Sequence, residues 1–304
     1  MAGPTFRAAP VHVRTPATSA NLGPGFDACG LALGLYDDVV VRISDSGLHV
    51  DVAGEGAETV SRGEDNLVVR AIRATFDALG GQPRGLQVVC ANRIPHGRGL
   101  GSSAAAICAG IRAAVGLTAS GAQRLGPGGE LRLATELEGH PDNVAACLLG
   151  GFTVSWTGPE GANALRLDPH PGLRATALVP PDPVATSTAR SLLPRSVRHA
   201  DAAANAGRAA LLTAALTRHP ELLLPATEDR IHQRHRAPAM PASHALVEAA
   251  RAKGVPALIS GAGPTVLTLG TEDRMDWLPQ DLPESWLVHR LTVDTEGTTI
   301  LPMA

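Results

Sequence analysis

The spacing of apolar positions changes several times along the first half of the chain, and each change marks a predicted element. Apolar and polar residues alternate in strand-like stretches, whereas apolar residues recur at helical spacing elsewhere. The pattern predicts strands at residues 11–14, 31–43, 48–52, 85–90 and 152–156, and helices at residues 67–79, 104–115 and 130–138. We expect residues 31–43 and 48–52 to form an antiparallel pair. Gly116 is placed to end the helix at 104–115, and residues 121–129 are expected to form a glycine-rich connection.

The second half begins after a stretch of turn-forming residues. Residues 157–172 are rich in Gly, Pro and Asn, which predicts a boundary between two domains. We place the first domain at residues 1–165 and the second at residues 166–304. The second is predicted to contain a strand at 174–179, helices at 201–217 and 243–253, a strand–turn–strand unit at 257–269 and a last strand at 286–293.

The composition is that of a globular protein and excludes several functional classes. The 304 residues include 44% hydrophobic and 18% charged ones, which argues against a disordered chain. A net charge of −3, the lack of a basic cluster and an aromatic content of 3% argue against nucleic acid as a partner. No apolar run approaches the ~20 residues that a membrane span needs, and no apolar leader is present. We therefore expect a soluble, cytoplasmic protein with no membrane partner.

The cysteines predict a reduced protein. None of the four belongs to a C-x-x-C pair, and each lies among small or apolar residues: Cys29, Cys90, Cys108 and Cys147. This placement favours buried core residues over a disulfide or a metal site.

The stretch PHGRGLGSSAAA at 95–106 lies between a predicted strand and a predicted helix. Glycines allow a close backbone approach, and the first N–H groups of a helix attract anions. Ser102 or Ser103 can cap the helix or offer a hydroxyl to a phosphate-bound Mg²⁺. The loop is not a Walker A motif, because it has no lysine, nor a Rossmann fingerprint, because one residue separates Gly99 from Gly101. By itself it predicts either a phosphate site or a flexible turn.

Two further polar stretches interrupt apolar segments. Residues 15–27 are expected to form a loop in which Asn21 and Asp27 can offer hydrogen bonds and a carboxylate to a polar ligand. The second stretch precedes a buried-looking run at 144–149 and gathers five polar side chains: Glu136, Glu138, His140, Asp142 and Asn143. Solvated charges at a helix end explain Glu136 well and the whole group poorly.

Three stretches in this order resemble motifs of the GHMP kinases, a family that includes galactokinase, homoserine kinase and mevalonate kinase. They are residues 16–27, the loop at 95–106 and the turn SGAGPT at 260–265. The nearest resemblance is to the homoserine kinases, through TSANLGPGFD at 18–27, HPDNVA at 140–145, ARSLLP at 189–194 and DRIHQ at 229–233. It implies an α+β fold of two domains, the first similar to domain 2 of ribosomal protein S5 and the second ferredoxin-like. It also implies an ATP-dependent kinase that phosphorylates the side-chain hydroxyl of L-homoserine in threonine biosynthesis.

The resemblance also implies roles for single residues. Asn66 would lie near the adenine, and the triphosphate would lie in a loop made of Pro95, His96, Gly97, Arg98, Gly99, Leu100, Gly101, Ser102, Ser103, Ala104 and Ala105. Arg98 stands where a small residue is common, so it either contacts a phosphate or faces solvent. Mg²⁺ would be held by Ser103 and Glu138, with Glu136 as a competitor.

The substrate site implied by the resemblance combines both signs of charge. It would be lined by Asn21, Asp27, His140, Asn143, Thr186, Arg190 and Arg236. Asp27 would face the ammonium group of homoserine, and the two arginines would hold its carboxylate, because a guanidinium binds a carboxylate bidentately. His232 is expected to order the loop that carries Arg236.

Catalysis would rest on Ser103, Glu138 and Asn143. Asn143 stands where many kinases have a carboxylate, and it cannot take a proton, so we expect no strong general base; Asp142 is the alternative base. Two other functions stay open: a mevalonate-type or sugar kinase of the same family, and a non-catalytic relative that senses ATP or a metabolite. A homodimer also fits, since dimers are common among such kinases.

Overall fold

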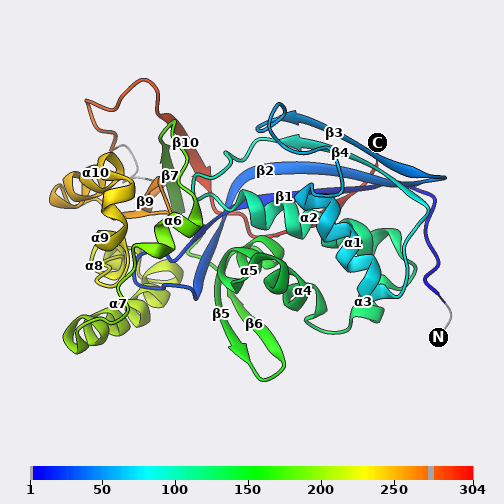
Figure 1. Ribbon diagram of the computed structural model, residues 1–304. Coiled ribbons are helices and arrows are strands. Elements are labelled where there is room, and N and C mark those ends of the chain that lie inside the picture. Colours follow the sequence, from blue (N-terminus) through cyan, green and yellow to red (C-terminus); the bar gives the residue numbers. More distant parts are fainter. Residues whose placement is uncertain (1–2, 273–276, 304) are drawn as a thin grey trace.

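The computed structural model describes residues 3–272 and 277–303, which form one sheet in each half of the molecule (Figure 1). The seven-stranded sheet consists of β1 (Val11–Ala20), β2 (Cys29–Ser44), β3 (Gly47–Gly54), β4 (Gly85–Asn92), β5 (Phe152–Gly158), β6 (Gly161–Leu167) and β11 (Thr299–Leu301). The four-stranded sheet consists of β7 (Leu173–Val179), β8 (Ala257–Ile259), β9 (Val266–Thr271) and β10 (Leu287–Thr292), in the order β10-β7-β9-β8.

Helices pack against both sheets, and the two halves meet near the middle of the molecule (Figure 1). The first half contains α1 (Leu67–Leu79), α2 (Ser102–Leu117), α3 (Gly121–Leu125), α4 (Gly129–Glu138) and α5 (Pro141–Leu149). The second half contains α6 (Thr186–Ser191), α7 (His199–Thr217), η1 (Pro220–Leu222), α8 (Leu223–Ala226), α9 (Gln233–Arg236), η2 (Ala237–Ala239) and α10 (Pro241–Ala252). The mixed α+β architecture expected from the sequence is confirmed.

The expected antiparallel pairing of residues 31–43 with 48–52 is wrong. Both stretches are strands, but β4 lies between β2 and β3, pairing antiparallel with β2 and parallel with β3. A parallel partner needs a crossover connection, and the segment that contains α1 provides it. Alternation identifies a strand but carries no information about which strand will become its neighbour.

Several predicted boundaries also differ from the structure. Strand β1 continues to Ala20 along β2, so residues 15–20 of the expected loop at 15–27 belong to the sheet, and the turn is confined to residues 21–27. Part of the expected connection at 121–129 is the short helix α3, and part of the stretch at 157–172 is strand β6. The strand at 286–293 is not the last one, because β11 follows and pairs with β1. The domain division at 165/166 stays a prediction.

Helix α2 runs through the centre of the first half and is buried along most of its length. Small side chains permit this position: a Cβ on Gly110 would lie 2.5 Å from the carbonyl oxygen of Val68 in α1. Gly116 does not end the helix, which continues to Leu117. A Cβ on Gly116 would lie 2.9 Å from Ile300 and 3.1 Å from Val11, so this glycine serves close packing instead of termination.

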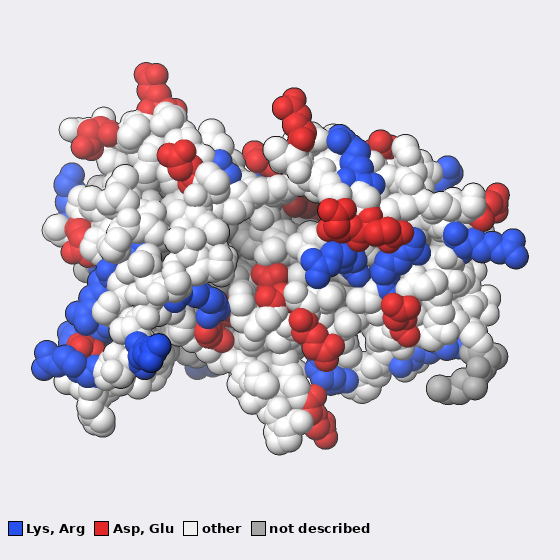
Figure 2. All heavy atoms as spheres, viewed as in Figure 1, with Lys and Arg blue, Asp and Glu red and all other residues white. Residues whose placement is uncertain are grey.

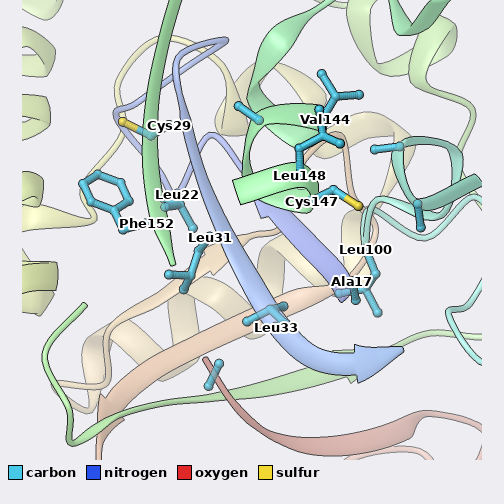
Figure 3. Close-up of a cluster of buried hydrophobic side chains, with 14 of the residues drawn as sticks. Ala17, Leu22, Cys29, Leu31, Leu33, Leu100, Val144, Cys147, Leu148 and Phe152 are labelled. Atoms are coloured by element: carbon cyan, nitrogen blue, oxygen red, sulfur yellow. The ribbon is translucent and has the colours of Figure 1, made fainter. Parts of the chain in front are cut away.

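One hydrophobic cluster joins the two halves beneath their junction. Figure 3 shows the part of it around β1, β2 and α5, to which Leu31, Leu33, Val144 and Phe152 belong. The same cluster continues into the strands of the second sheet. All four cysteines are buried and free, which confirms the expectation of reduced core residues. Among the described residues, no helix combines the length and apolar character needed to cross a bilayer.

Candidate active site

Three segments that are far apart in the sequence meet at the junction of the halves. The backbone N–H of Thr18 donates to the carbonyl of Leu100 (3.0 Å), which joins the end of β1 to the glycine loop. The N–H of Gly261 donates to the carbonyl of Ala20 (3.1 Å), and the Ser260 hydroxyl lies 2.6 Å from the carbonyl oxygen of Gly99. The strand end, the loop and the turn at 260–265 therefore form one hydrogen-bonded unit.

The glycine loop depends on glycine at specific positions. Gly97, Gly99 and Gly101 have φ values of 66°, 75° and 71°, in the left-handed region. A Cβ on Gly101 would collide with the side chain of Thr18. Helix α2 starts directly after Gly101, which has no side chain to cap it, so of the two roles that the sequence offered for Ser102 or Ser103, the helix cap is not formed. The first N–H groups of a helix have no partner within the helix, so the anion site expected here stays a prediction.

Arg98 fastens this loop to the second half of the molecule. Its Nε donates to the carbonyl of Pro180 (3.2 Å), and its other two nitrogens donate to the carbonyls of His96 (2.6 Å) and Pro181. The backbone N–H of Val184 also donates to the carbonyl of Gly97 (3.0 Å). The guanidinium is therefore engaged with carbonyl oxygens on both sides, and it acts as a clamp.

Two cavities flank the start of α2. The first, of about 260 Å³, is walled largely by the apolar side chains of Val39, Val52, Val60, Leu67 and Val68. The second, of about 220 Å³, is polar and receives residues from both halves. Ser102 and Ser103 line both cavities, so the first turn of α2 stands between them. Figure 2 shows that this face of the molecule is hollowed where the halves meet.

Asn66 lines the first cavity but uses its side chain to cap a helix. Its Oδ1 accepts from the N–H groups of Val68 (3.0 Å) and Val69 (3.3 Å) at the start of α1, and its Nδ2 donates to the carbonyl of Ser61 (2.7 Å). These bonds hold the entrance of α1 in place beside the cavity, as an N-cap residue does.

Ser103 and Glu138 meet at the edge of the second cavity. The Ser103 hydroxyl donates to Oε1 of Glu138 at 2.6 Å, although the residues come from different helices. Burial raises the pKa of the Glu138 carboxyl, while the hydrogen bond from Ser103 opposes this rise. Glu136 is exposed and does not line this cavity. A hydroxyl and a carboxylate at one point are the hard oxygen ligands that Mg²⁺ accepts.

The start of α5 brings a linked polar group to the cavity wall. His140 donates from Nδ1 to Oδ1 of Asp142 (2.7 Å), and the same oxygen accepts from the N–H of Asn143 (2.8 Å). The hydrogen bond to Asp142 raises the pKa of His140. The Thr18 hydroxyl donates to Oδ1 of Asn143 (2.8 Å), which leaves the Nδ2 donors of Asn143 for a ligand.

Asn21 and Asp27 hold the turn after β1 in shape. Asn21 has a φ of 67°, and its Nδ2 donates to the carbonyl of Gly261 (2.8 Å) while its Oδ1 accepts from the N–H of Asp27 (2.9 Å). The Asp27 carboxylate accepts two hydrogen bonds from Arg190, at 2.8 Å and 3.1 Å. Thr186, at the start of the same short helix α6, lines the second cavity with Arg190.

Arg236 also reaches the second cavity, and it is almost completely buried, with 1% of its surface exposed. One of its nitrogens, Nη1, donates to the carbonyl of Gly261 (3.1 Å) and lies 3.3 Å from Nδ1 of His232. Its Nε is buried and has no hydrogen-bond partner. Burial lowers the pKa of this guanidinium, and the nearby charge of Arg190 lowers it further. A buried guanidinium with an unpartnered N–H would be stabilised by an anion that pairs with it.

Six of the seven residues expected at the substrate site line the second cavity, and the seventh, Asp27, binds Arg190 of its lining. The structure also adds residues that sequence reasoning did not assign. Thr18 orients Asn143, and the ring of Phe26 lies under the guanidinium groups of Arg190 (5.9 Å) and Arg236 (5.3 Å). Both residues stand in the motif at 18–27, so the motif itself was the available signal. Nothing in the local sequence pairs Phe26 with arginines more than a hundred positions away.

Comparisons with known proteins identify the family. The family model for the GHMP kinases N terminal domain matches residues 66–151, and the model for the GHMP kinases C terminal domain matches residues 202–285. The homoserine kinase of Streptomyces coelicolor is 66% identical over 304 residues, covering 100% of this chain and 98% of that protein. The homoserine kinase of Streptomyces avermitilis is 65% identical, with 100% of each chain covered.

The fold comparison gives the same result. The crystal structure of the homoserine kinase from Cytophaga hutchinsonii superposes with a TM-score of 0.82 at 28% identity, covering 99% of this chain and 100% of that one. Sequence relatives and fold thus agree over nearly the whole length of the chain, and one family model matches a part of each half. The chain belongs to the homoserine kinases of the GHMP kinase family.

Proposed function

We propose that this protein transfers the γ-phosphoryl group of ATP to the side-chain hydroxyl of L-homoserine, giving O-phospho-L-homoserine. Membership of a kinase family implies ATP as the donor. The observation that carries the choice of acceptor is Arg236, which lines the second cavity and has a buried Nε without a hydrogen-bond partner. Asp27 and Arg190 add a carboxylate and a second cation beside it. This set suits a small zwitterion better than a sugar or a plain hydroxy acid.

The two cavities support separate sites for the nucleotide and the acceptor. The adenosine would occupy the apolar first cavity, next to Asn66. The triphosphate would follow the glycine loop and end at the first turn of α2, where the amide groups favour negative charge. The acceptor would occupy the polar second cavity. Because the serines at 102 and 103 line both cavities, the γ-phosphate and the acceptor hydroxyl would meet there.

Ser103 and Glu138 fit the Mg²⁺ that kinases use. No group of three or more His, Cys, Asp and Glu side chains suited to a metal was found in the described part of the chain. Two protein oxygens are nevertheless sufficient for Mg²⁺, which usually keeps waters and takes its other ligands from phosphates. When bound, the ion would neutralise charge on the phosphates. The pair at 2.6 Å supports Glu138 over the exposed Glu136 as the ligand.

The acceptor site supports phosphoryl transfer without a strong general base. The amide of Asn143 cannot take a proton, and its Nδ2 can donate to the acceptor. Asp142 is 2% exposed, and its Oδ1 already accepts two hydrogen bonds. We infer that the hydroxyl proton leaves late, to phosphate or water, in keeping with a loose transition state in which positioning supplies most of the catalysis.

The proposed function is tested by ADP release from Mg-ATP with a panel of acceptors. The panel contains L-homoserine, mevalonate, galactose, L-serine and no acceptor. Release with homoserine alone is expected. Release with mevalonate or galactose would instead identify another GHMP kinase activity, and ATP binding without any release would point to a sensor. A homodimer and a cytoplasmic location stay predictions.

A further inference from the structure

We propose that His232 is a positioning residue that holds the Arg236 guanidinium in place for the acceptor's carboxylate. The inference rests on the proposed function and deepens it. It assigns His232 a specific chemical state: a neutral imidazole with its proton on Nε2. In that state the ring links Arg236 to the loop that carries Asn21 and Asp27.

The hydrogen bonds of His232 determine its tautomer. Nε2 lies 2.7 Å from the carbonyl oxygen of Gly23, which can only accept, so Nε2 must carry a proton. Nδ1 lies 3.3 Å from Nη1 of Arg236, which can only donate, so Nδ1 must carry a lone pair. The ring is neutral in this arrangement, and a proton on Nδ1 would place two donors against each other.

The surroundings of His232 favour this neutral state. The residue is 0% exposed, and burial lowers its pKa. Arg236 lowers the pKa further, whereas Asp229 and Asp27 oppose the shift. Asp229 lies 3.5 Å from Nε2 of His232 through its Oδ1, so the ring lies between a cation and a carboxylate. If the ring were protonated on both nitrogens, its positive charge would lie against that of the Arg236 guanidinium. The hydrogen bond from Arg236 to Nδ1, which the proposed role requires, would then be lost.

The segment that carries both residues is held rigidly. The carboxylate of Asp229 accepts from the N–H groups at 231, 232 and 233, and these bonds cap the start of α9. The side-chain oxygen of Gln233 accepts from the N–H of Ile259 in β8. The ring of Phe26 packs 5.1 Å from that of His232 and 5.3 Å from the Arg236 guanidinium.

The consequence concerns the orientation of Arg236. Its Nη1 is fixed by the Gly261 carbonyl and by His232, so the guanidinium, whose Nε has no partner, keeps one orientation. A planar guanidinium binds a carboxylate bidentately only when its plane is set. His232 therefore acts through Arg236, and its effect should be confined to acceptors that have a carboxylate.

Two substitutions separate the two hydrogen bonds of His232. H232N places an amide near the Nδ1 position and can still accept from Arg236, whereas H232Q places one near the Nε2 position and keeps only the contact with Gly23. We expect H232Q to raise the KM for L-homoserine by about 10-fold or more, with H232N within about 3-fold of the wild type. The KM for ATP should stay within about 2-fold for both variants.

The control is an acceptor without a carboxylate. With 3-aminopropan-1-ol, H232Q and the wild type should have equal kcat/KM, because Arg236 has nothing to bind. Equal losses with both acceptors, or equal losses for H232N and H232Q, would overturn the proposal while leaving the kinase function intact. A wild-type protein that releases no ADP with homoserine would overturn the proposed function and this inference together.

A measurement on the wild type keeps the proposal testable if H232Q does not fold. The ¹⁵N shifts of the His232 ring identify its tautomer directly. We expect the proton on Nε2 and a neutral ring throughout the pH range in which the kinase is active. A proton on Nδ1 in the folded protein would overturn the proposal, because Nδ1 could then not accept from Arg236.

Discussion

Arg190 and Asp27 bind each other through two hydrogen bonds, of 2.8 Å and 3.1 Å between the guanidinium nitrogens and the carboxylate oxygens. These residues are proposed to bind opposite charges of the acceptor. Their side chains are 36% and 38% exposed, so the pair is worth only about 0–1 kcal/mol and can open readily. An acceptor with both charges can replace this pair with two new ones, whereas an acceptor with one charge leaves a partner uncompensated.

The D27N substitution tests this exchange of ion pairs. We expect D27N to raise the KM for L-homoserine by about 10-fold or more, because the ammonium group loses its carboxylate. The same variant should use 4-hydroxybutanoate, which lacks the ammonium group, better than the wild type does, because Arg190 is freed. Steady-state kinetics with both acceptors give the ratio of the kcat/KM for L-homoserine to the kcat/KM for 4-hydroxybutanoate. A ratio that D27N leaves unchanged would contradict a role of Asp27 in selecting the ammonium group.

The S103A and E138Q substitutions test the proposed metal ligands. Each should lower kcat by about 100-fold or more, because a phosphate-bound Mg²⁺ would lose one of its two protein oxygens. E136Q is the matched control, and since Glu136 is exposed it should retain nearly full activity. A severe loss of kcat in E136Q, with activity kept in E138Q, would identify Glu136 as the metal ligand instead of Glu138.

Glu138 is expected to favour catalysis but, because its pKa is raised, to lower the stability of the folded protein at neutral pH. A carboxyl with a folded-state pKa above its unfolded value stabilises the protein at pH below the unfolded pKa and loses this contribution as pH rises through the folded one. At neutral pH the buried charge therefore opposes folding. We expect E138Q to melt no lower than the wild type at pH 7, and the difference to become smaller on acidification. Calorimetry at several pH values measures it, and a clear loss of stability at pH 7 would contradict the sign.

The D142N substitution tests whether a general base acts. Asp142 holds His140 and the N–H of Asn143, so D142N should disturb positioning and lower kcat by less than about 100-fold. It should also lower the pKa of His140, because the hydrogen bond that raises it is weakened. Complete loss of turnover with homoserine binding and folding intact would identify Asp142 as the base.

Arg98 provides a test that separates a clamp from a phosphate ligand. R98M and R98K should both raise the KM for ATP by about 10-fold, since neither residue can reach the carbonyls of His96, Pro180 and Pro181 together. The matched comparison is the lysine variant, which keeps the charge. If R98K behaved like the wild type while R98M did not, the charge itself would be the important property, and Arg98 would be a phosphate ligand.

Much of the local structure follows from the sequence, because local sterics and hydrophobic periodicity determine it. The glycine loop and helix α2 were predicted together, since positive φ at Gly97, Gly99 and Gly101 is available mainly to glycine. The strands β2 and β3 were both found by alternation, but their separation by β4 was not. Gly116 shows the same limit of reasoning from local sequence. A glycine at this position predicts a helix end, but α2 continues to Leu117, and Gly116 allows Val11 and Ile300 to pack closely against the helix.

The sequence by itself indicated the family, the glycine loop and most of the polar residues that line the second cavity, because each is carried by a short contiguous motif. Only the tertiary structure decided how these residues are paired: Asp27 with Arg190, Ser103 with Glu138, and Arg236 with His232. It also turned Arg98 toward carbonyls of the second half instead of leaving it free. The physical reason is that such pairs join groups from separate elements, and their geometry and dielectric surroundings exist only after the two halves have packed together.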